Sequence, residues 1–165
     1  MTAQDKSSDI KDRLKFLPMA CDPRIKAVSE YWASLPRTDD GIPLRRHFDP
    51  VDLAPSLLPY LWMVDVEHVL GRFRFRLCGA HLVEALGGNP TGRYYDEVFT
   101  GFRETKTYDA LMRVGKTGQG SWRSGDPNLK FPNHDIKALE RVFLPLTKYG
   151  SRTDIVLAGS IYRFR

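Results

Sequence analysis

Residues 72–78 alternate strictly between arginines and apolar side chains, and this pattern constrains the fold more than any other feature of the chain. The two sets are Arg72, Arg74 and Arg76 on one parity, and Phe73, Phe75 and Leu77 on the other. Because successive side chains of a β-strand point to opposite faces, the pattern predicts a strand with one charged and one buried face.

A second predicted strand, over residues 60–67, favours one register for a hairpin. A loop over 68–71 would place three pairs on the charged face: Glu67 with Arg72, Asp65 with Arg74 and Met63 with Arg76. The buried face would hold three apolar pairs: Val66 with Phe73, Val64 with Phe75 and Trp62 with Leu77. This register joins opposite charges on one face and apolar groups on the other, which is how cross-strand pairs stabilise a sheet.

The rest of the chain alternates between helical and extended patterns. Asp22 and Pro23 suit the N-cap and first turn of a helix over 23–35, whose apolar stripe is Ile25, Val28, Trp32 and Leu35. Further helices are expected over 81–86 and 102–114, and strands over 119–123, 139–147 and 154–164. This order predicts an α+β fold: a five-stranded antiparallel sheet with helices on one face and an N-terminal flanking helix.

The composition suits one globular domain. The chain has 165 residues, 42% hydrophobic and 27% charged, which excludes wholesale disorder. No stretch approaches the ~20 apolar residues of a spanning helix, and residues 1–15 lack the apolar core of a signal peptide. We therefore expect a cytoplasmic protein without membrane contact, with a flexible lead over 1–21, a flanking helix over 22–39 and a main domain over 40–165.

Groups that would carry catalysis or bind a metal are few. Cys21 and Cys78 are far apart, and no metal-ligand spacing is found around the histidines His68, His81 and His134. His47 and Asp49 lie close together in the Arg45–Asp49 segment, and such a pair supports acid–base chemistry. A small α+β enzyme using this loop is thus the alternative to a binding module, although no catalytic residue and no metal site is assigned.

The predicted order of elements resembles that of PAS domains. Residues 73–79 followed by 81–87 are similar to the second strand and first helix of that family, and Gly87–Val98 resembles its pattern of a glycine-terminated helix followed by Gly-Arg. The stretches 57–65 and 74–79, with Gly92 and Arg93, are similar to short single-PAS bacterial proteins of poorly characterised function. The resemblance covers about residues 40–164.

PAS membership implies a sensor or interaction module in signal transduction, often dimeric, with a small ligand between sheet and helices. The segment 89–95 lacks the cysteine of flavin photoreceptors, and 102–114 lacks the histidine typical of haem-binding members, so both cofactors are disfavoured. The cavity candidates are Phe73, Phe75, Leu77, Leu86, Tyr95, Tyr108, Met112, Val142, Leu144 and Leu157. They would form either a filled core or a partly open pocket for a small molecule. Arg93 would either pair with a nearby carboxylate or contact an anionic ligand.

Surface residues give the remaining expectations. A protein partner or a second copy of the chain would contact the interface candidates Val28, Trp32, Leu35, Arg74 and Arg76. For the helix stripe, docking on its own domain is the alternative. The excess of 25 Lys and Arg over 20 Asp and Glu is spread thinly, and Phe73 and Phe75 would be buried opposite the arginines, so stacking on RNA bases is not favoured. The sequence thus predicts a sensory module that binds a small ligand, a partner protein or both, with nucleic-acid binding third.

Overall fold

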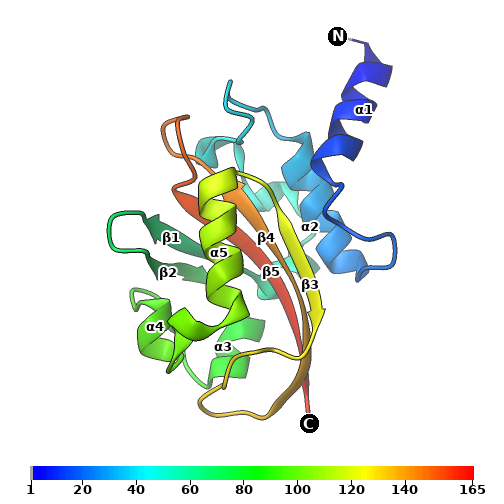
Figure 1. Cartoon of the computed structure of the whole chain (residues 1–165). Helices are drawn as coiled ribbons and strands as arrows, with labels where there is room; N and C mark the ends of the chain where they lie inside the picture. The colour runs from blue at the N-terminus through cyan, green and yellow to red at the C-terminus, as the bar shows by residue number, and fades with distance from the viewer. Residues whose placement is uncertain (1) are drawn as a thin grey trace.

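The computed structural model describes residues 2–165 and contains a five-stranded antiparallel sheet (Figure 1). Its strands are β1 (Leu61–Glu67), β2 (Arg72–Cys78), β3 (Ser121–Gly125), β4 (Ile136–Leu146) and β5 (Ile155–Phe164). They lie in the order β2-β1-β5-β4-β3, so the last strand of the chain occupies the centre of the sheet. The predicted α+β class and antiparallel sheet are confirmed.

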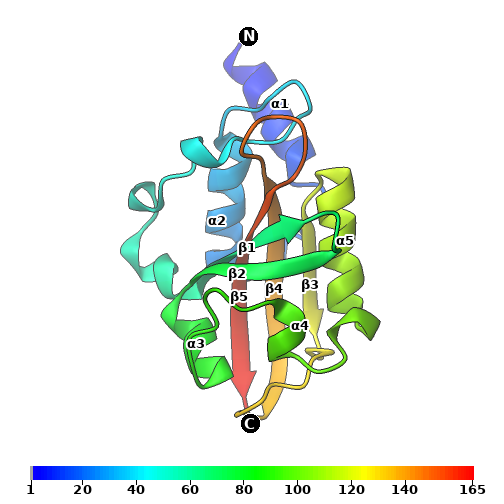
Figure 2. The same ribbon diagram turned by 90° about the vertical axis from the view of Figure 1, so that its left-hand side faces the viewer.

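Helices cover both faces of this sheet (Figure 2). One face carries α2 (Pro23–Ser34), and the other carries α3 (Ala80–Leu86), α4 (Tyr95–Val98) and α5 (Lys106–Thr117). Short 3-10 helices connect them: η1 (Arg45–His47), η2 (Pro50–Asp52), η3 (Pro55–Tyr60) and η4 (Phe102–Glu104). Within residues 2–165, no helix has both the length and the apolar character needed to cross a bilayer.

The apolar stripe of α2 docks on the sheet of its own domain. Val28, Trp32 and Leu35 are buried there, so of the two alternatives for this stripe, its own domain or a second subunit, the structure has the first. The N-terminus of this helix was predicted correctly, since the Asp22 side chain accepts a hydrogen bond from the Arg24 amide at 2.8 Å.

The presence of α2 also changes which strand residues face α3–α5. Val142, Leu144 and Leu157 were expected in the ligand cavity, but they pack against α2 on the opposite face. Both faces of β4 over Val142–Leu146 and of β5 over Ile155–Tyr162 are buried, so these stretches have no polar face and no clear alternation. Where both the odd- and the even-numbered residues of a strand are apolar, the sequence does not show which set faces α2 and which set faces α3–α5.

The β1–β2 hairpin has the predicted register near its turn and a different one at its far end. Four predicted pairs form, from Glu67 with Arg72 to Val64 with Phe75. A β-bulge then shifts the ladder, so that Met63 lies opposite Leu77 rather than Arg76. Beyond a bulge, side chains change faces. Leu77 is therefore turned away from the α3–α5 layer, and its predicted place in the cavity is wrong.

Two helix boundaries differ from the prediction. Residues 1–21 were expected to be a mobile lead, but α1 (Ala3–Arg13) lies within them, capped by reciprocal hydrogen bonds between Thr2 and Asp5. The Thr-x-x-Asp spacing of this capping box was the available sequence signal. The long helix starts at Lys106 instead of 102, because the Thr105 side chain caps it by accepting from the Tyr108 amide.

His81 connects α3 to the centre of the sheet. β1 begins at Leu61, opposite Gly159, so residues 160–164 of β5 have no β1 neighbour. Over this stretch the Tyr162 amide donates to Nε2 of His81 at 2.9 Å, which requires a neutral ring. Burial, which disfavours the charged form, lowers the pKa of His81 from its ordinary 6.5.

Replacing His81 with alanine should lower the free energy of unfolding at pH 8 by about 1–3 kcal/mol, because the Tyr162 amide loses its acceptor. The folded-state pKa is depressed, so the stability contributed by His81 is complete above pH 6.5 and is lost as pH falls through the folded value. Urea denaturation of both proteins from pH 8 to pH 5 would measure this, with exposed His47→Ala as control. A wild-type advantage that does not shrink at low pH would contradict the assignment.

Candidate functional site

The space between the sheet and α3–α5 is filled by aromatic rings. Phe73, Phe75, Leu86 and Tyr95 are buried there as predicted, with Tyr108 and Met112 partly buried beside them. Tyr95 is the centre of the stack: its ring centroid lies 4.8 Å from that of Phe75 and 4.3 Å from that of Phe102. Of the two alternatives for this region, the structure has the filled core.

A small internal cavity remains beside Tyr95. Its volume is about 10 Å³, and its walls come from the sheet, α4 and α5. The lining residues are Trp62, Tyr95, Thr107, Arg123, Leu129, Phe131, Leu139, Arg141, Phe143, Ser160 and Tyr162. A cavity of this volume holds about one water molecule.

Arg141 reaches this cavity from β4 and was not identified from the sequence. Its side chain is buried, with 6% exposure, and Nη1 donates to the carbonyl oxygen and the hydroxyl of Ser121 at 3.2 and 3.1 Å. The guanidinium lies 4.0 Å from the ring centre of Phe143. The sequence carried no signal for it, because both parities of β4 are buried from Arg141 to Leu146.

The arginine face of β2 keeps the predicted Asp65–Arg74 pair, while Arg72 and Arg76 have partners other than those predicted. Arg72 forms a bidentate pair with Asp96 of α4 at 2.8 and 2.7 Å, and Glu67 accepts from the Tyr94 hydroxyl instead. The pKa of Asp96 is lowered mainly by its hydrogen bonds with Arg72. Asp65 receives the other cations of this strand, with Arg76 at 3.2 Å and Arg74 at 4.0 Å. Arg74 and Arg76 keep nearly half of their side-chain surface exposed.

Arg93 contributes through its backbone to the edge of the sheet. Its carbonyl oxygen accepts from the Phe75 amide at 2.9 Å, and the Gly92 amide donates to the Phe75 carbonyl at 2.8 Å. The Arg93 side chain is exposed and donates to the carbonyl oxygen of Glu97. The predicted carboxylate partner is therefore a backbone carbonyl, and the segment protects an otherwise open edge strand.

The Arg45–Asp49 loop does not assemble an acid–base pair. The Asp49 carboxylate caps η2 by accepting from the Val51 amide at 3.0 Å, and Arg45 donates to the Phe48 carbonyl oxygen at 3.0 Å. Within residues 2–165, no hydrogen bond joins His47 to Asp49. The geometry gives the loop a structural role in turning the chain toward β1.

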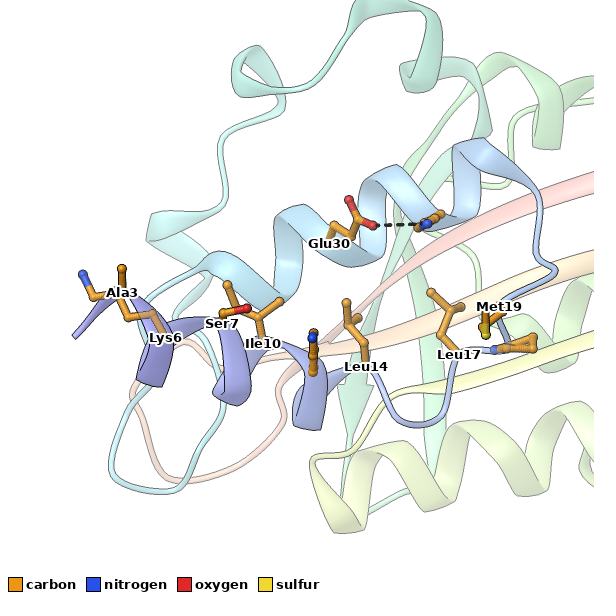
Figure 3. Close-up of a pocket in the computed structure, with 11 residues that line it drawn as sticks. Ala3, Lys6, Ser7, Ile10, Leu14, Leu17, Met19 and Glu30 are labelled. Atoms are coloured by element: carbon orange, nitrogen blue, oxygen red, sulfur yellow. Dashed lines mark ion pairs between the residues drawn. The ribbon is translucent and has the colours of Figure 1, made fainter. Parts of the chain in front are cut away.

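Two of the hollows elsewhere on the molecule are apolar in part. One, of about 300 Å³, is apolar and lies where the bulge turns Leu77 outward, beside Leu58 and Cys78. The other is a groove of about 770 Å³ between α1, the segment 14–19 and α2 (Figure 3). Its apolar floor is formed by Ile10, Leu14, Leu17 and Met19, and Met19 is fully exposed.

Basic side chains surround this α1–α2 groove. Lys6, Lys11 and Lys26 line it, and Glu30 lies 3.9 Å from Lys26 as an ion pair (Figure 3). Around α1 the surface continues into a hollow of about 260 Å³ that contains Arg13 and Arg37. Burial and the nearby Arg13 lower the pKa of Arg37 to about 9.

A sheet in the order β2-β1-β5-β4-β3, with its short helices between β2 and β3, defines a PAS-type fold. The PAS domain family model matches residues 20–160, and the chain belongs to this family. The matched range includes α2, which had been placed outside the main domain. PAS domains are sensory or regulatory modules, and this general class applies to the chain.

The chain also matches the solved structure of an RNA-binding light-oxygen-voltage receptor, with a TM-score of 0.42 and 12% identity. The similarity covers 98% of this chain and 50% of that one, so the chain spans half the length of the receptor. No curated protein matches the sequence.

Proposed function

We propose that this PAS domain is a regulatory module that acts by binding a partner protein in the α1–α2 groove. The observation that carries the proposal is the contrast between the two candidate sites. The space under α3–α5 is narrowed to about 10 Å³, whereas the groove has a volume of about 770 Å³ and is lined by the apolar side chains of Ile10, Leu14 and Leu17. Exposed apolar surface rimmed by polar groups is typical of protein interaction sites.

The charge around the groove favours an acidic amphipathic helix as the partner element. Such a helix would place its apolar face on Ile10, Leu14 and Leu17 and its carboxylates near the surrounding lysines. The Arg37 guanidinium lies beside α1, over the ring of Trp32 at 4.1 Å, and adds to the positive charge near the groove.

The proposal is tested by photo-crosslinking in the native cell, with a benzophenone amino acid in place of Met19. The matched control carries the same group at Val69, which is 98% exposed in the β1–β2 turn. We expect position 19 to give one defined crosslinked product, and we expect position 69 not to give that product. Mapping of the adduct should identify an acidic amphipathic helix, and Leu14→Asp with Leu17→Asp should weaken binding of that purified partner at least about tenfold.

Three results would overturn this function. The first is the same adduct from both positions, which indicates non-specific proximity. The second is an adduct of the chain with itself, which indicates a homodimer interface rather than a separate partner. The third is a mapped partner that binds the double variant and the wild type equally. Thermal melting of each variant would show that the domain remains folded.

A further inference from the structure

The internal cavity beside Tyr95 contains a buried cation without a counter-charge. None of the ion pairs among residues 2–165 includes Arg141. Its one hydrogen-bonding partner within the same range is Ser121, which is neutral. A buried charge is stable in a protein when it is paired or fully hydrogen-bonded. A negatively charged partner for Arg141 would therefore have to come from outside residues 2–165.

The other groups around the cavity also favour an anion. Arg123 is a second lining cation, and Arg123 and Arg113 both act on Arg141 as like charges. None of the lining residues is acidic. Four of them carry hydroxyl groups: Tyr95, Thr107, Ser160 and Tyr162. The Ser160 oxygen accepts a hydrogen bond from Trp62, and the Ser160 hydroxyl is hydrogen-bonded to Tyr162.

The size of the cavity narrows the class of anion. The centre of a water-sized particle can move over about 10 Å³ in this cavity, which leaves room for one monatomic ion somewhat larger than water, whereas a carboxylate or a phosphate needs room for several heavy atoms. We propose that this cavity is a binding site for a monatomic halide anion of the size of chloride, held by the Arg141 guanidinium. The site is separate from the α1–α2 groove and does not depend on the function proposed for it.

Anion binding would tie the stability of the aromatic core to the anion concentration. A ligand that binds the folded state and not the unfolded state raises stability with its concentration. Arg141 lies on β4, while Thr107 and Tyr95 come from α5 and α4. A bound halide would therefore connect the sheet to the helical layer through one set of contacts.

The direct test is crystallisation of the wild-type chain in sodium bromide, with diffraction recorded at the bromine absorption edge. We expect an anomalous peak inside the cavity, next to the guanidinium of Arg141. Arg141→Gln should abolish that peak, and Arg46→Gln, at an exposed arginine, should retain it. Absence of an anomalous peak in the wild-type cavity would mean that only water occupies it and would overturn the proposal.

A measurement in solution does not depend on crystals. Chloride would replace gluconate at constant ionic strength while the melting temperature is recorded. The melting temperature of the wild type and of Arg46→Gln should rise and saturate, and that of Arg141→Gln should stay constant. An equal rise in Arg141→Gln would overturn the proposal. If Arg141→Gln does not fold, a wild-type melting temperature that does not respond to chloride would by itself overturn the proposal.

Discussion

Replacing Trp32 with alanine is expected to lower the free energy of unfolding by about 3–5 kcal/mol, among the largest effects of any single change in the chain. Trp32 is 3% exposed and joins three parts of the molecule. Its Nε1 donates to the Pro145 carbonyl oxygen at 2.9 Å, and its ring packs edge-on against Phe16 and beneath the Arg37 guanidinium. Urea denaturation would measure the loss.

The same variant distinguishes an internal from an intermolecular role for α2. The indole is enclosed by its own chain, so the oligomeric state measured by light scattering should not change. Tyr149→Ala, at a residue 88% exposed, is the control and should alter stability by less than about 0.5 kcal/mol. Wild-type stability together with a smaller particle for Trp32→Ala would instead place α2 at a subunit interface.

Replacing Tyr95 with alanine is expected to cost a similar amount, about 3–5 kcal/mol. The Tyr95 ring lies in the middle of an aromatic stack with Phe75, Phe99 and Phe102, at centroid distances of 4.8, 5.1 and 4.3 Å. Removal of the ring leaves an apolar cavity at the place where a core ligand would bind. Empty apolar cavities of this kind accept small aromatic molecules.

Small aromatic compounds therefore test whether Tyr95 occupies the place of a ligand. Indole or phenol should raise the melting temperature of Tyr95→Ala and leave that of the wild type unchanged. Tyr95→Phe keeps the ring, so it should lose much less stability than the alanine variant and should not respond to indole. An equal response of the wild type would show that its core already has room for a ligand of this size.

Much of the fold could be predicted from local patterns. The alternation of 72–78 gave the bounds of β2, and Asp22 with Pro23 gave the start of α2, because strand alternation and helix caps depend on neighbouring residues alone. The hairpin register was correct up to the bulge between Met63 and Val64. A bulge leaves the apolar pattern unchanged and alters only which residues lie opposite each other, so the sequence carried no clear signal for it.

The candidate site was predicted in part. Phe73, Phe75 and Tyr95 were placed correctly in the α3–α5 layer, because β2 has one polar face and one apolar face. Arg141 and the α1–α2 groove were not foreseen. A single arginine in an apolar strand resembles an exposed residue until the packing around it is known, and the groove needs α1, the segment 14–19 and α2 in place together.

The sequence by itself determined the elements of this protein and their order, since the hydrophobic period and the caps are properties of adjacent residues. Only the tertiary structure decided which layer each face of β4 and β5 contacts, and that aromatic rings fill the core while a groove stays open beside α1. Local patterns record that a side chain is buried, but the neighbour that buries it is set by contacts between residues far apart in the chain. Trp32 and Pro145, separated by 113 positions, are one such pair.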